Sequence, residues 1–187
     1  MATTTDPAAD DDDVAVVAEL LGRAPQGGFR VVVRDHAGVP RVILNEPILA
    51  DGTPMPTRYW LVGDRDRLLV SRLESAGGVG AAEAAVGLAV IAEAHGRYAV
   101  ERDAAIPSGH AGPRPSGGVG GTRRGVKCLH AHYAWHLAGG DDPVGAWVAD
   151  RLAEGAGEIG ATLRGGDTDS ASGPGPDTSI DADPGDA

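Results

Sequence analysis

Cysteine, lysine and aromatic side chains are scarce in this sequence. The 187 residues include one cysteine, one lysine and only 4% aromatic residues. A single cysteine excludes a disulfide within the chain, which fits a reducing compartment such as the cytoplasm. No run reaches the roughly 18 apolar residues of a membrane helix, and the first residues lack the basic and apolar regions of a secretory signal. We therefore expect a cytoplasmic protein that is not inserted into a membrane.

Basic residues are absent from both ends of the chain, where aspartate accumulates. Residues 1–13 and 165–187 hold eleven of the 27 acidic residues, which leaves 16 acidic residues against 16 basic ones in residues 14–164. Ends rich in Gly, Pro, Ser, Thr and Asp are typical of disordered chain. Their negative charge repels nucleic acid and anionic lipid. We expect one domain at 14–164 between two disordered acidic tails, and no nucleic-acid partner.

Three short apolar segments predict a small sheet. Residues 29–34 are rich in valine, and a turn at Gly38 and Pro40 separates them from a second strand at 41–44. A stiff loop with two prolines covers residues 51–57, and a third strand follows at 58–62. Three strands with one apolar face need a layer of helices over them.

Helical spacing of apolar residues dominates the rest of the chain. The helices that we expect cover residues 14–21, 64–76, 79–105, 122–138 and 143–154. The segment 107–121 is rich in proline and glycine and is expected to be a loop. The predicted fold is therefore α+β, with about three antiparallel strands packed by four or five helices.

The only cysteine lies among three histidines within residues 123–136. If 122–138 is one helix, a rotation of about 100° per residue places Cys128, His132 and His136 on one face and His130 almost opposite. Thiolate and imidazole are good zinc ligands, so the shared face could hold a metal together with a ligand from another element.

Two other interpretations of this segment stay open. In the one that the sequence favours, Cys128 and Trp135 belong to the core, while His132 and His136 make polar contacts at its edge. In the other, Cys128 is a reactive thiol and His130 or His132 assists it, although no neighbour in the sequence is an obvious base. The residues by themselves identify no cofactor.

Basic residues precede the cysteine. Three cations lie at the start of the expected helix, where free backbone N–H groups favour anions. Cations there are unfavourable to the helix dipole unless an anion compensates them, although solvent-facing arginines are the simpler explanation. The segment is not a Walker A loop. The residues that we expect to bind an anion are Thr122, Arg123, Arg124 and Lys127, with Asp51, Thr53, Thr57 and Tyr59 as the facing wall of a pocket.

Four stretches in matching order resemble a known family. These are DGTPMPT at 51–57, YWL at 59–61, SRLE at 71–74 and VKCLHAH at 126–132. Together they resemble the bacterial family Domain of Unknown Function 501 over about residues 15–150. The resemblance implies no particular activity. Members often lie in genomes near a septum-formation initiator, which implies a context in cell division or the envelope.

The sequence departs from the family pattern at two places. Members often carry a Cys-x-Cys-Gly element in the early hairpin, where this chain has Arg34-Asp35-His36-Ala37-Gly38 and neither sulfur. If those cysteines join the later ones around a metal, Asp35 and His36 would give a harder and weaker site here. Members also tend to have histidine where Trp135 stands. Both departures count against zinc.

Three classes of function follow from these observations. The first is a module that binds phosphate or another small anion at the Gly/Arg/Lys-Cys-Leu-His segment. The second, ranked nearly level, is an interaction protein with a partner in a cell-division or envelope assembly. The third is a metal- or thiol-dependent enzyme, which the sequence favours least.

Overall fold

The computed structural model describes the backbone of residues 8–165 and the side chains of residues 8–155. The rest of the two expected tails, residues 1–7 and 166–187, lies outside the described residues. The elements are α1 (Asp11–Leu21), β1 (Phe29–Arg34), β2 (Pro40–Asn45), β3 (Tyr59–Leu61), α2 (Asp64–Ser75), α3 (Gly78–Val86), α4 (Leu88–Ala104), η1 (Val119–Gly121), α5 (Leu129–Leu137) and α6 (Pro143–Gly165). The fold that carries the site is the compact unit that ends at Glu154, within α6.

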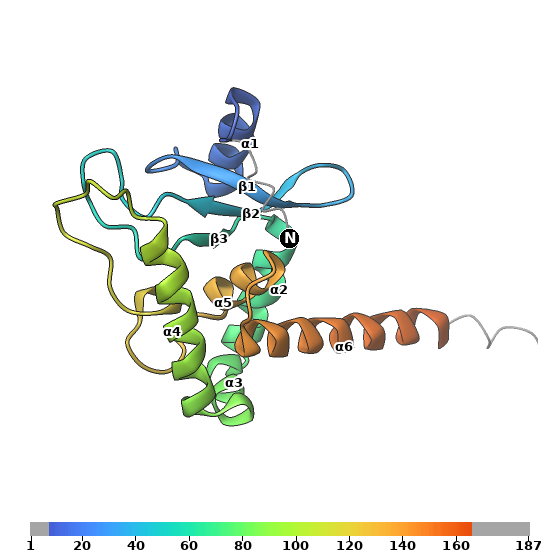
Figure 1. The fold of residues 1–187 in the computed structure, drawn as a ribbon. Helices are drawn as coiled ribbons and strands as arrows, with labels where there is room; N and C mark the ends of the chain where they lie inside the picture. The colour runs from blue at the N-terminus through green and yellow to red at the C-terminus, as the bar shows by residue number, and fades with distance from the viewer. Residues whose placement is uncertain (1–7, 166–187) are drawn as a thin grey trace, which may run out of the picture. The chain divides into compact units, whose positions relative to one another are not determined.

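The three strands form one antiparallel sheet in the order β1-β2-β3. The α+β fold and all three expected strands are confirmed, each strand to within one residue at either end. Neighbouring residues of β2 point into two different cores. Val42 and Leu44 belong to the larger core, which lies between the sheet and the helical layer. Ile43 packs with Val17 of α1 on the other face of the sheet. The sheet is therefore covered on both faces (Figure 1), because α1 closes the second one.

The helices beneath the sheet bring distant segments together. Figure 1 shows α2 and α5 side by side under the strands, with α4 along one flank. Leu129, Ala134 and Trp135 of α5 are almost fully buried against this core, as expected for Trp135. Because α5 lies at the centre of the helical layer, residues near its start meet the last turn of α2.

Glycine backbone conformations make the boundaries of two helices differ from our expectation. The expected helix at 79–105 is two helices, α3 and α4, which meet at Gly87 with φ of 84° and ψ of 138° and a bend of 96°. Only glycine adopts that conformation readily. The expected helix at 122–138 begins only at Leu129, because Gly125 has φ of 62° and Cys128 is extended.

The first helix begins earlier than expected. Asp10 caps α1, its side chain accepting a hydrogen bond from the Asp13 N–H at 2.8 Å. Asp11, Asp12 and Asp13 occupy the first turn, where negative charge stabilises the helix. These aspartates, placed in the tail by composition, are therefore part of α1.

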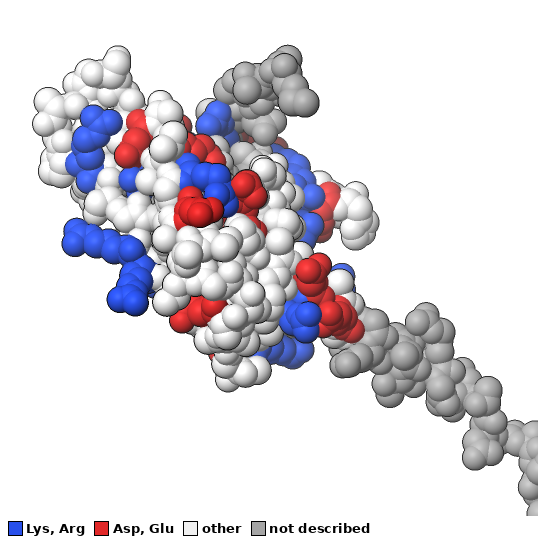
Figure 2. All heavy atoms as spheres, turned by 60° about the horizontal axis from the view of Figure 1, so that its bottom comes forward, with Lys and Arg blue, Asp and Glu red and all other residues white. Residues whose placement is uncertain are grey.

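The surface charge and the apolar content of the helices can be described for the residues of the structure. On the face that Figure 2 shows, both basic and acidic side chains lie among uncharged ones. Within residues 8–165, no single helix has the length and apolar composition to cross a membrane; the bent pair α3 and α4 passes that test only when the two are combined.

Candidate metal centre at the start of α5

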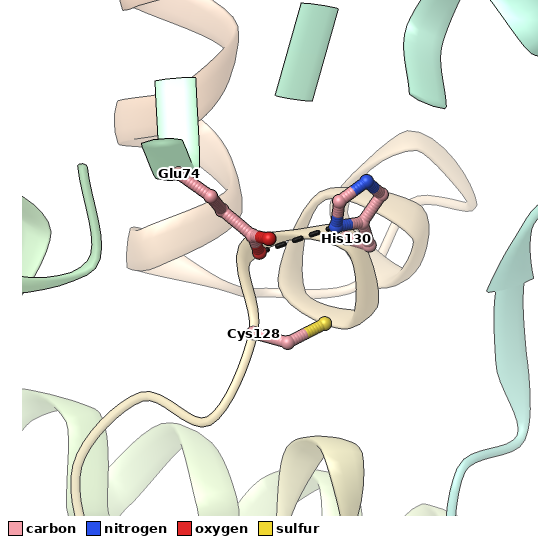
Figure 3. A group of neighbouring side chains, drawn as sticks. All are labelled: Glu74, Cys128 and His130. Carbon is pink, nitrogen blue, oxygen red and sulfur yellow. Dashed lines mark hydrogen bonds and ion pairs between the residues drawn. The ribbon is translucent and has the colours of Figure 1, made fainter. Parts of the chain in front are cut away.

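Cys128 immediately precedes the first residue of α5 and does not belong to the helix. Its backbone is extended, with φ of −159° and ψ of 136°, and the first helical residue is Leu129. The helical rotation that we assumed from residue 122 therefore does not apply to Cys128. The predicted separation of Cys128 from His130 is wrong for this reason, and the two side chains lie together (Figure 3).

Glu74 reaches the same point from the end of α2. Its Oε1 accepts a hydrogen bond from the Leu129 N–H at 2.5 Å and lies 3.1 Å from Nδ1 of His130. The carboxylate thus satisfies one of the free N–H groups at the start of α5 and complements the helix dipole. In Figure 3 it approaches the His130 ring from the same side as the cysteine sulfur.

Glu74, Cys128 and His130 form a group with the composition of a metal site. One ligand atom from each lies within 4.8 Å of the others, and no other such group of three or more occurs among the described side chains. All three side chains are partly exposed, Glu74 and His130 each to 26%. Solvent or a small ligand therefore has access to the group.

The second nitrogen of His130 is held by α2. His130 Nε2 lies 3.3 Å from the Arg67 carbonyl oxygen and 3.2 Å from Ser71 Oγ. Because a carbonyl only accepts, Nε2 carries a proton and Nδ1 is directed at Glu74 and Cys128. The hydrogen bond with Cys128 raises the pKa of His130 above 6.5; the charge of Glu74 adds to this, and partial burial opposes it.

His132 has a different partner. It is fully buried, and its Nδ1 lies 2.7 Å from Oδ2 of Asp142. Asp142 Oδ1 also accepts from the N–H groups of Val144 and Gly145 at the start of α6. Nε2 of His132 is buried and has no hydrogen-bond partner among the described residues. The expected position at the edge of the core is wrong, because Asp142 compensates the burial of the imidazole.

The expected metal face is not formed. Cys128, His132 and His136 do not come together as ligands in the described part of the chain, where Cys128 instead meets Glu74 and His130. Sequence reasoning missed Glu74, which lies 55 residues before its hydrogen-bond partner Leu129. The only signal for it was its place in the SRLE stretch that resembles the family.

The residues expected to bind an anion lie before the helix and not on it. Arg123, Arg124 and Lys127 are exposed, and no ion pair involves them within residues 8–155. Thr122 Oγ1 donates to the Arg124 carbonyl at 3.0 Å. The predicted source of the anion site, free N–H groups of a helix that begins at Thr122, is wrong, because that helix begins at Leu129 and Glu74 already binds its first N–H.

The facing loop is partly committed to other contacts. Asp51 and Thr53 are exposed, and Asp51 Oδ1 accepts from the Thr53 N–H at 2.9 Å. Thr57 is half-buried. Tyr59 is buried, and its hydroxyl donates a hydrogen bond to Glu101. The loop does approach the glycine-rich segment, since a Cβ on Gly121 would lie 3.2 Å from Pro56.

The early hairpin contributes no ligand. Asp35 Oδ1 accepts from the N–H groups of Ala37 and Val39, both at 2.9 Å, and so closes the β1–β2 turn. His36 is exposed beside it. Neither belongs to the group around Cys128 as the described residues lie.

Comparison with known proteins identifies the family alone. No curated protein and no solved structure matches the chain. A family described as a protein of unknown function, DUF501, matches residues 31–150, which is more than half of the 187 residues. The chain therefore belongs to the DUF501 family.

Proposed function

We propose that this protein binds a divalent transition-metal ion, with zinc the best fit, through Glu74, Cys128 and His130. The observation that carries the proposal is the convergence of one sulfur, one nitrogen and one oxygen ligand within 4.8 Å. Zinc accepts all three ligand types, whereas magnesium and calcium require oxygen ligands. Three protein ligands leave a fourth tetrahedral position for water or another molecule.

The surroundings of His130 support this proposal independently. A histidine that binds a metal commonly donates its other ring N–H to a carbonyl or a similar acceptor, which fixes the tautomer. The Arg67 carbonyl and Ser71 Oγ provide that acceptor for Nε2, so Nδ1 is the nitrogen directed at the group. Nδ1 lies 3.1 Å from Oε1 of Glu74, so a cation bound at this point would contact both atoms.

The proposal changes the ranking that the sequence gave. The sequence favours a metal- or thiol-dependent enzyme least, and both departures from the family pattern, at residues 34–38 and at Trp135, count against zinc. The ligand set now proposed does not use the hairpin, since Glu74 takes the place of a further sulfur. The smaller number of thiolates makes the proposed site harder than a cysteine-rich one.

The test is zinc binding by the purified full-length chain and three ligand variants. Elemental analysis after equilibration with buffered zinc is expected to show one bound ion per chain. Cys128→Ser, His130→Gln and Glu74→Gln should each weaken zinc binding by about tenfold or more. Glu74→Gln is the sharpest variant, because its amide oxygen can still accept from the Leu129 N–H while the charge is lost.

The control is His36→Gln, which removes an exposed histidine remote from the group in the sequence. It should bind zinc as the unmodified chain does. Stoichiometric zinc in all three ligand variants, or no zinc in the unmodified chain, would contradict the proposal.

An anion site is a second candidate, favoured by the exposed Arg123, Arg124 and Lys127 without ion pairs among the described side chains. We propose inorganic phosphate as its probe. Phosphate should raise the melting temperature of the chain, and Arg123→Ala with Arg124→Ala should abolish that rise, whereas Arg72→Ala on α2 should not. An equal rise in all variants would contradict it.

The remaining expectations keep the support that they had from the sequence. A partner in cell division or the envelope rests on the acidic ends and the family's genomic context. A cytoplasmic location rests on the single cysteine. Co-purification with tagged full-length and tail-deleted protein tests the first, and no enrichment with either would contradict it.

A further inference from the structure

His95 of α4 holds two separate points of one loop. Its ring is buried, with 7% of the residue exposed. Nδ1 accepts a hydrogen bond from the Val119 N–H at 3.1 Å, and Nε2 lies 2.9 Å from the Gly125 carbonyl oxygen. We call residues 117–126 the basic loop, since they carry Arg123 and Arg124.

The basic loop is shaped to rest on this ring. A Cβ on Gly118 would lie 2.3 Å from both Cβ and Cγ of His95, so only glycine allows the backbone to approach so closely. Two further contacts fix the ends of the loop. Arg102 Nη1 donates to the Gly117 carbonyl at 2.5 Å, and Glu83 Oε1 accepts from the Val126 N–H at 2.7 Å.

The two backbone partners determine the charge state of His95. An N–H only donates and a carbonyl only accepts, so His95 must be neutral with its proton on Nε2. A second proton on Nδ1 would face the Val119 N–H, and two donors cannot share that bond. The bond from Nε2 to Gly125 would instead become charge-assisted and stronger.

We propose that His95 is a pH-sensitive clasp, which on protonation releases the Val119 side of the basic loop and retains the Gly125 side. Arg102 continues to hold Gly117 and the Val119 side chain lies in the core, so the part that is freed is residues 120–124. This part carries Arg123 and Arg124. The inference does not depend on metal binding, because neither His95 nor its two backbone partners belong to the proposed ligands.

The charged groups around His95 set the direction of the response. His132 of α5 lies with its ring centroid 5.6 Å away, and Asp142 is bonded to His132. Glu83 of α3 lies at the Gly125 end. Burial is the main cause that lowers the pKa of His95 below 6.5; the bond to Gly125 opposes it, His132 lowers the pKa further and Asp142 raises it. The clasp is therefore closed at neutral pH and opens in acid.

Amide hydrogen exchange on the full-length chain tests the clasp. The His95 ring is followed by NMR from about pH 7.5 to the onset of acid unfolding, and exchange is corrected for its intrinsic pH dependence. Protection of the Val119 amide against exchange should fall by about tenfold as the pH is lowered. The midpoint of this fall should be the pH at which the His95 ring is half protonated. The Val126 amide, bound to Glu83, should keep its protection over the same step.

Two variants identify the group responsible. In His95→Asn the amide oxygen can accept from the Val119 N–H but does not titrate, so Val119 protection should become independent of pH. His36→Asn should respond as the unmodified chain does. If His95→Asn fails to fold, the comparison of ring and amide in the unmodified chain decides alone. The clasp is excluded by a ring that titrates without a change at Val119, by a ring that stays neutral until the chain unfolds, or by an unchanged response in His95→Asn.

Discussion

Three histidines of the helical layer differ in what each nitrogen contacts. His130 has one nitrogen at Glu74 and the other at the Arg67 carbonyl. His132, two residues further on, is buried against Asp142. His95 has both nitrogens on backbone groups. Each partner is distant enough in sequence that spacing could not identify it. These different partners are the basis of the metal site proposed at His130 and of the pH response proposed for His95.

Asp142 is expected to be far more important for stability than its neighbour Asp141. Asp142→Ala leaves His132 and the N–H groups of Val144 and Gly145 without their acceptor, and should cost about 2–4 kcal/mol. Asp141 is 79% exposed in its side chain and pairs with Arg97 at the surface, so Asp141→Ala should cost about 0.5 kcal/mol or less. Urea unfolding of both variants measures the difference. Equal losses would show that Asp142 has no such role.

His95 should make the fold less stable in acid. Its pKa is lower in the folded chain than the 6.5 of an ordinary histidine, so the unfolded chain binds more protons. Stability is therefore lost as pH falls through the unfolded pKa toward the folded one. His130 acts in the opposite sense, because its folded pKa is raised. To isolate the contribution of His95, the free energy of unfolding in urea is measured at about pH 7.5 and 5.5 for the unmodified chain and for His95→Asn. The change between the two pH values is then compared between the two chains.

Removing His95 should reduce the loss of stability between the two pH values. A larger loss in His95→Asn than in the unmodified chain would contradict the assigned sign.

At the level of elements, the conformation of one glycine divides an expected helix into two. The sequence showed glycines at 87 and 96 within one alanine-rich segment, and spacing could not tell which of them interrupts it. The structure breaks the segment at Gly87 and continues α4 through Gly96. The positive φ of Gly87 belongs to the bend, whereas Gly96 has helical neighbours on both sides and nothing within 4 Å of an added Cβ.

The same substitution should therefore have opposite effects at these two sites. Gly87→Ala forces a side chain into a conformation that only glycine adopts readily and should cost about 1–3 kcal/mol. Gly96→Ala fills open space on a helix and should stabilise by up to about 1 kcal/mol. Thermal unfolding of the two variants checks this. A stabilising Gly87→Ala would mean that the bend between α3 and α4 is not fixed by this glycine.

The strands were predictable and the start of α5 was not, for physical reasons. The strands at 29–34 and 41–44 follow from valine-rich segments separated by Gly38 and Pro40, signals that lie within a few residues. The start of α5 depends on the turn at Gly125 and on Glu74, which caps Leu129 from a different helix. The helix begins at Leu129 and not at the expected Thr122, which leaves Cys128 outside the helix and close to His130.

At the scale of the whole molecule, neither the net charge of the domain nor its family membership identifies a function. Residues 14–164 are formally neutral, and the face in Figure 2 carries both signs of charge. The group of Glu74, Cys128 and His130 is where chemically different side chains converge. The proposed metal site uses all three of these side chains.

Cobalt substitution tests the proposed metal site most directly. A Co²⁺ ion bound to a thiolate gives a charge-transfer absorption band, whereas Zn²⁺ bound to the same thiolate gives no such band. Adding Co²⁺ to the full-length chain should produce a thiolate-to-metal charge-transfer band that saturates at one ion per chain and disappears when zinc is added. Cys128→Ser should remove the band, and Glu74→Gln and His130→Gln should weaken cobalt binding by about tenfold. A chain that gives no band, or a band whose concentration dependence is unchanged by Glu74→Gln and His130→Gln, would contradict the proposed site.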